Sequence, residues 1–99
     1  MSTILPIVNN NGTSRDELIQ QRRNVVEGID HVLNELRQMY PHGRDYQTDL
    51  TGEQYPLARK QHERRVKTLT DLRNELQNEA AALYRSDDKN HQETNPKDD

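Results

Sequence analysis

The chain has 99 residues, of which 29% are hydrophobic and 31% are charged, and it contains no cysteine, phenylalanine or tryptophan. A chain of this length forms one small domain at most, and the lack of cysteine excludes disulfides, thiolate metal sites and thiol nucleophiles. The formal net charge of −3 argues against binding to nucleic acid or to an anionic membrane through bulk attraction.

Residues 1–13 are predicted to form a flexible N-terminal arm. A short apolar patch at residues 4–8 is followed by the turn-favouring run 9–12. The first helix begins just after this arm, because Ser14 followed by Glu17 is a capping-box pattern in which each residue satisfies a backbone N–H of the other.

Apolar residues then recur at alternating spacings of four and three over residues 14–40, as in the a/d seam of a packed helix. This predicted seam consists of Leu18, Arg22, Val25, Ile29, Val32, Leu36 and Met39. A second line on the same face consists of Ile19, Val26, Leu33 and Tyr40. The whole face spans on the order of 160°, which is too broad for one neighbouring helix to cover.

Residues 41–54 are predicted to form a loop, because Pro41 disfavours helical backbone at the residue before it. The loop is longer than the roughly 2 to 8 residues usual between helices of a bundle, and it gathers residue types that are enriched at binding hot spots. The partner-binding candidates around this bend are Tyr40, His42, Arg44, Tyr46 and Tyr55. The alternative is that the tyrosines close the open end of the bundle while Arg44 is solvated.

A second amphipathic helix is predicted over residues 55–84, with Pro56 in its first turn, where the missing N–H costs nothing. Two helices of similar length joined by one loop favour an antiparallel hairpin, so the predicted fold is an all-α hairpin domain at residues 14–84. The predicted level pairs are Leu18 with residues 76–80, Ile29 with 66–69, and 36–39 with Ala58 and His62. Residues 85–99 are predicted to be a disordered acidic tail.

The breadth of the apolar face predicts a partner. A hairpin with so few large side chains would not offset the ordering entropy of its backbone, and the commonest solution is a homodimer that forms a four-helix bundle. Three polar residues fall on the predicted inner stripes: Arg22, His62 and Arg65. We expect the arginines to pair with Glu79, Glu75 or an acid of the dimer mate, and His62 to lie at the edge of the core.

The start of the second helix is basic, with a patch formed by Arg59, Lys60, Arg64 and Lys67. Such a segment can grip phosphates, so binding to nucleic acid is the alternative function, although no DNA-binding pattern accompanies it. His31 has Glu27 and Glu35 one turn away on either side, but the trio is expected on a solvated face, so no metal site is predicted.

No residues form a catalytic constellation, because every serine lies at or beyond a helix end. We therefore predict a protein that is not an enzyme and holds no cofactor, and that uses its loop and termini to bind an unidentified protein. No apolar run approaches the roughly 20 residues of a membrane span, and no basic segment precedes the N-terminal apolar patch, so a cytoplasmic location is expected.

Overall fold

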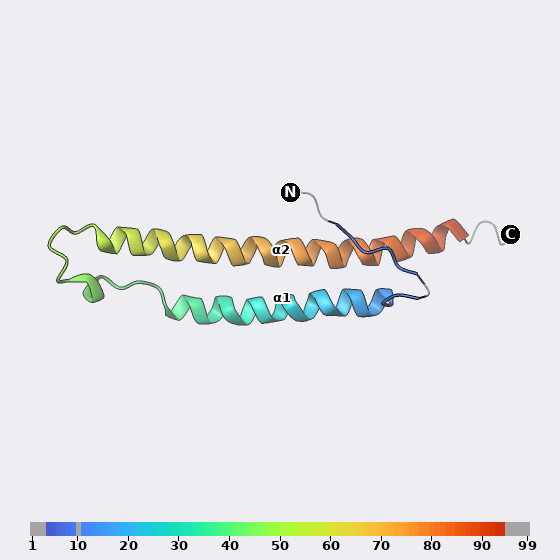
Figure 1. The fold of residues 1–99 in the computed structure, drawn as a ribbon, viewed down its shortest axis with the longest axis horizontal. Coiled ribbons are helices and arrows are strands. Elements are labelled where there is room, and N and C mark those ends of the chain that lie inside the picture. Colours follow the sequence, from blue (N-terminus) through green and yellow to red (C-terminus); the bar gives the residue numbers. More distant parts are fainter. Residues whose placement is uncertain (1–3, 10, 95–99) are drawn as a thin grey trace.

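The protein is an antiparallel pair of helices (Figure 1). The computed structural model describes the backbone of residues 4–9 and 11–94, and the side chains of these residues up to Arg85. Helix α1 spans Arg15–Gln38, a 3-10 helix η1 spans Gly43–Tyr46, and helix α2 spans Gln54–Thr94. The rod measures 77 × 21 × 20 Å, and the described part of the chain holds no strand. The predicted all-helical hairpin is confirmed.

The start of α1 is the predicted capping box. The Ser14 side chain accepts a hydrogen bond from the Glu17 N–H at 3.2 Å, and the Ser14 N–H donates to the Glu17 carboxylate at 3.3 Å. At the other end the Met39 N–H donates to the Leu36 carbonyl at 2.9 Å, so the helix ends at Gln38, two residues before the predicted end.

Helix α2 starts on a hydrogen-bonded turn centred on Asp49. One carboxylate oxygen of Asp49 accepts from the Gln54 N–H at 2.8 Å, and the other accepts from the Thr51 hydroxyl at 2.8 Å. Gly52 completes the turn at a φ of 74°, a conformation that glycine adopts without a steric penalty. These bonds hold the pKa of Asp49 below its ordinary value, the Gln54 N–H contributing most, because N–H donors favour the charged carboxylate.

The end of α2 corrects the prediction. The helix continues to Thr94, ten residues beyond Tyr84, through most of the segment that was predicted to be disordered. Polar composition argues against burial, but it does not break a helix, and neither glycine nor proline occurs between Pro56 and Pro96. The remaining residues of the predicted tail, 95–99, lie outside the described residues.

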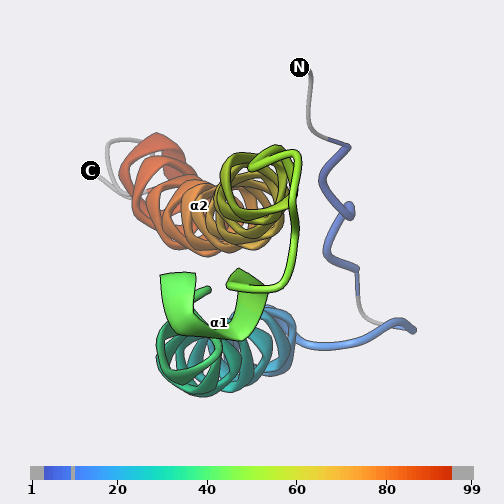
Figure 2. The same ribbon diagram turned by 90° about the vertical axis from the view of Figure 1, so that its left-hand side faces the viewer.

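The buried cluster sits near the start of α1. It consists of Leu18, Ile19, Ala80 and Leu83, with Leu5 and Val8 of the N-terminal arm packed against it. Figure 2 shows the arm running along one side of the helix pair. Ile4 and Ile7 of the same arm are 91% and 88% exposed, so only some of its apolar residues face the helices. This packing differs from the flexible arm that was predicted for residues 1–13.

The register between the helices is displaced from the predicted one by roughly one and a half turns. The observed level pairs are Arg22 with Glu79, Asp30 with Arg73, and Tyr40 with His62. The displacement arises because the chain does not turn back directly after α1. Residues 39–46 instead run on beside the start of α2, as Figure 1 shows, and α2 therefore begins beyond the end of α1.

Candidate functional site

One side of the helix pair carries an uncovered row of apolar residues. Val25, Val32 and Met39 follow one another at seven-residue spacing, which places them in one line along α1, and they are 48%, 45% and 62% exposed. Leu72 of α2 lies about level with this row and is 42% exposed. We call these four residues the open flank.

The open flank corrects the predicted seam. Val25, Val32 and Met39 were assigned to the interior but are exposed. Leu18 and Ile29 of the same predicted seam are buried, together with Ile19 and Val26 of the second line. The apolar face of α1 is broader than α2 can cover, so one edge of it must stay outside. The register and the position of the arm decide which edge that is.

A groove of about 320 Å³ runs between the helices beside the open flank. It is lined by Val32, Leu36, Arg64, Arg65, Thr68 and Leu69. Carbon atoms supply nearly all of its exposed lining. An apolar groove with cationic side chains at its edge is suited to a helix that brings both apolar and acidic groups.

Gly28 lies between Val25 and Val32 on the same side of α1. A Cβ atom added to it would meet nothing within 4 Å, so no contact inside the hairpin requires glycine there. Glycine in a helix interior destabilises the helix by about 1 kcal/mol relative to alanine. Gly28 therefore lowers the stability of the isolated hairpin, and no contact within the hairpin compensates for this loss.

The polar residues of the predicted seams differ in their surroundings. Arg22 is paired: its Nε donates to Glu79 at 2.8 Å, its Nη1 donates to the Leu18 carbonyl at 3.1 Å, and both charged side chains are largely buried. His62 is buried and meets the Tyr40 ring edge to face, at 5.2 Å between centroids. Arg65 is exposed at the edge of the groove and makes no ion pair with any side chain that the structure describes.

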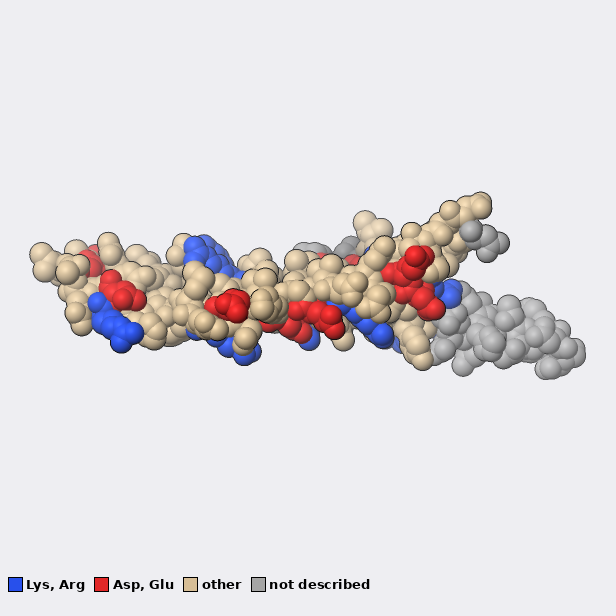
Figure 3. Space-filling model, turned by 90° about the horizontal axis from the view of Figure 1, so that it is seen from below, with Lys and Arg blue, Asp and Glu red and all other residues tan. Residues whose placement is uncertain are grey.

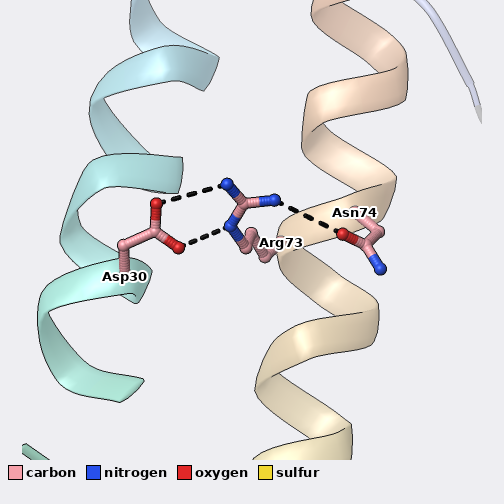
Figure 4. A network of polar contacts seen from close by, with 3 residues as sticks. All are labelled: Asp30, Arg73 and Asn74. Atoms are coloured by element: carbon pink, nitrogen blue, oxygen red, sulfur yellow. Dashed lines mark hydrogen bonds and ion pairs between the residues drawn. The ribbon is translucent and has the colours of Figure 1, made fainter. Parts of the chain in front are cut away.

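A further ion pair joins the helices on the opposite side from the open flank. The Arg73 nitrogens Nε and Nη2 donate to the two carboxylate oxygens of Asp30, and Nη1 donates to the side-chain oxygen of Asn74 at 3.4 Å (Figure 4). The hydrogen bond from Arg73 lowers the pKa of Asp30 and, reciprocally, raises that of Arg73. Sequence periodicity gave no signal for this pair, because both residues lie outside the apolar stripes.

The loop end brings the predicted tyrosines into contact with other side chains of the hairpin. The ring centroids of Tyr46 and Tyr55 lie 5.9 Å apart, and the guanidinium carbon of Arg59 lies over the Tyr55 ring, 5.1 Å from its centroid. His42 and Arg44 are exposed. A second hollow of about 640 Å³ lies beside these rings, lined by Tyr46, Gln54, Leu57, Ala58, Lys60, Gln61 and Arg64. Its edge is basic, and Leu57 is 61% exposed.

The basic patch is exposed, but part of it is engaged within the chain. Arg59 rests on Tyr55, and Lys67 pairs with Asp71 at 2.7 Å one turn later. Lys60 and Arg64 line the hollow at the loop end. Seen from the α1 side in Figure 3, the molecule carries charges of both signs along this face.

Within the described residues, no three metal-ligating side chains come together, and His31 is exposed on α1. No described helix has a stretch that is both long and apolar enough to cross a bilayer. Comparison with known proteins found no relative: no family model, curated protein or solved structure matches this chain. The surfaces of the chain itself are therefore the guide to its function.

Proposed function

We propose that this chain is a non-enzymatic assembly module, a helical hairpin that associates with a second copy through its open flank and offers its loop end to another protein. The observation that carries the proposal is the open flank itself. Four large apolar side chains lie uncovered beside an apolar groove, in a chain that has few large apolar residues. Exposed contiguous apolar surface of this kind marks interaction sites.

The energetics of the hairpin support the same conclusion. Only six hydrophobic residues are buried among those described, and no side chain is less than 2% exposed. A core of this size gives little stability against the ordering entropy of two long helices. Covering the open flank with a second hairpin would bury further apolar area and complete a four-helix bundle.

The test of self-association is the mass in solution. Sedimentation equilibrium at micromolar concentration should give about twice the 11.6 kDa of one chain. Val32→Asp places a charge at the centre of the open flank and should shift the equilibrium toward the single chain by at least about tenfold. Tyr84→Asp is the matched control, since Tyr84 is 58% exposed on the other side of α2. A wild-type chain that stays single at high concentration would contradict the proposal.

The role of the loop end is tested separately. Replacing the exposed residues His42 and Arg44 with serine should leave the mass of the assembly unchanged, because both lie in the loop, beyond Met39, the last residue of the open flank. The same variant should lose binding to a partner protein captured by the wild-type chain from its native host. Unchanged capture would remove the loop from the proposal.

The alternative function is binding to nucleic acid through the basic start of α2. The observation that favours it is the exposure of all four patch residues, Arg59, Lys60, Arg64 and Lys67. This alternative predicts a mobility shift with duplex or single-stranded nucleic acid that weakens steeply with salt. Reversing three of these charges to glutamate should then abolish the shift.

A further inference from the structure

We infer that the second copy docks antiparallel, with the two loops at opposite ends of the assembly, so that the open flanks meet around a twofold axis beside Val32. This inference rests on the proposed self-association and adds its geometry. Two twofold arrangements would cover the open flank: one with the loops together and one with the loops apart. The charges along α2 distinguish them.

The charged residues of helix α2 are unevenly distributed, with an excess of basic residues in its first part and of acidic residues in the rest. From Gln54 to Lys67 it carries five Lys or Arg residues and one Glu, whereas from Thr68 to Thr94 it carries three Lys or Arg and six Asp or Glu. With the loops together, the twofold axis runs along the rods, so each α2 packs against α1 of the other copy and both basic halves lie at the same end of the assembly. With the loops apart, the two basic halves lie at opposite ends of the assembly. About an axis level with Thr70, each basic half faces residues 73–86 of the other copy, which carry two Arg and two Glu instead of a second basic run.

The antiparallel arrangement brings Arg65 opposite an acidic residue of the other copy. Val32 lies midway between Val25 and Met39, and the observed register places it level with about Thr70. A twofold axis at that level brings Arg65 of one copy opposite Glu75 of the other, because each lies five residues from Thr70. Arg65 makes no ion pair with the described side chains of its own chain, and Glu75 is half-buried. With the loops together, the two Arg65 residues would share one level of the bundle, and Glu75 would lie ten residues away from both.

The α1 side of the contact fits the same axis. Val25 of each copy lies opposite Met39 of the other, and Gly28 lies opposite Leu36, four residues on either side of Val32. The open space at Gly28 then receives a large side chain, as in knobs-into-holes packing. This contact explains why glycine stands in the middle of a helix where the hairpin alone does not require it.

The absence of native cysteine allows the arrangement to be measured with single spin labels. Leu57→Cys places a label on an exposed site 13 residues from Thr70, and Tyr84→Cys places one 14 residues away on the other side. With the loops apart, the two copies of either label should be about 40 Å apart or more, at 1.5 Å per residue. With the loops together, both separations should fall below about 25 Å.

The outcomes are distinct. Long distances at both sites support the antiparallel arrangement. Short distances at both sites overturn it while leaving self-association intact. The absence of any dipolar coupling at concentrations up to the millimolar range, with helical content unchanged, shows a single chain and overturns the proposed function together with this inference.

A charge exchange gives an independent check that needs no label. Arg65→Glu alone and Glu75→Arg alone should each weaken self-association by about threefold to tenfold, because each places like charges opposite one another. The double variant, which restores opposite charges across the axis, should recover most of the loss. If Arg65→Glu leaves the affinity unchanged, the two residues do not face each other and the antiparallel register is overturned.

Discussion

The two sides of this hairpin carry similar lines of apolar residues on α1, but one line is buried and the other is exposed. On one side the line of Ile19 and Val26 is buried, the N-terminal arm packs against its end, and Asp30 and Arg73 join the helices. On the other side the line of Val25, Val32 and Met39 stays exposed, with an empty groove beside it. We call the first the closed flank. The difference teaches that an apolar stripe predicts burial only when something in the fold, or in a partner, is available to cover it.

The largest expected effect comes from the buried end of the closed flank. Leu83 is 2% exposed, so Leu83→Ala should lower the free energy of unfolding by about 2–5 kcal/mol, through lost burial and the cavity left behind. The matched variant Leu72→Ala truncates an identical side chain on the open flank. At dilutions where the chain is single it should cost less than about 1 kcal/mol. Equal losses in urea titrations of the two variants would remove the distinction between the flanks.

The docking of the arm should have the next largest effect. Leu5 and Val8 are half-buried against the cluster, so replacing both with serine should destabilise the protein by about 1–3 kcal/mol. Replacing Ile4 and Ile7 with serine is the control, because both side chains are exposed and the two substitutions remove slightly more apolar side chain from the arm than the Leu5 and Val8 pair does. Thermal unfolding followed by circular dichroism would compare them. A larger loss from the control pair would mean that the arm packs through its other face.

Gly28→Ala should act in opposite directions on the single chain and on the assembly. In the single chain it should raise the stability by about 0.5–1 kcal/mol, because alanine favours the helix and its Cβ meets nothing. In the assembly it should weaken association, because the added methyl group occupies the space assigned to Leu36 of the other copy. Denaturation at two protein concentrations separates the effects. Stabilisation at both concentrations would show that no helix packs there.

The smallest expected effect is the pH dependence of the closed flank. The hydrogen bond from Arg73 lowers the pKa of Asp30 in the folded state. A carboxyl group with a lower pKa in the folded than in the unfolded chain adds stability above its ordinary pKa and loses it as the pH falls through the folded value. Stability should therefore decline below about pH 4. Asp30→Asn should make that decline shallower, and Asp45→Asn in the loop serves as the comparison. If the stability of Asp30→Asn falls with acidification as steeply as that of the wild type, the ion pair is not the cause of the decline.

The sequence predicted the elements of this fold better than their arrangement. The capping box at Ser14 and the proline in the first turn of α2 follow from local patterns, and each is present. Glu79 was one of the partners expected for an arginine on the inner stripe, and Arg22 pairs with it. The register does not follow, because it depends on the path of residues 39–53. The Asp49 turn that fixes the start of α2 uses side-chain hydrogen bonds that leave no periodic signal.

The candidate surface was predictable only in part. The breadth of the apolar face on α1 indicated that some of it would remain uncovered, and this is what the exposures of Val25 and Val32 report. Which edge would be uncovered was not predictable, because the arm covers its cluster through contacts between residues far apart in the sequence. The end of α2 was misjudged because polar composition was taken to mean disorder in a segment that no glycine or proline interrupts.

The enclosed pair of Arg22 and Glu79 has a mechanical consequence. If either helix slid by one turn along the other, the guanidinium would lose its carboxylate while still shielded from water, and such an orphaned charge is strongly destabilising. Slippage to another register is thereby penalised at this pair, and it would also break the ion pair between Asp30 and Arg73. A force applied at the loop should accordingly move the two helices together instead of sliding one along the other.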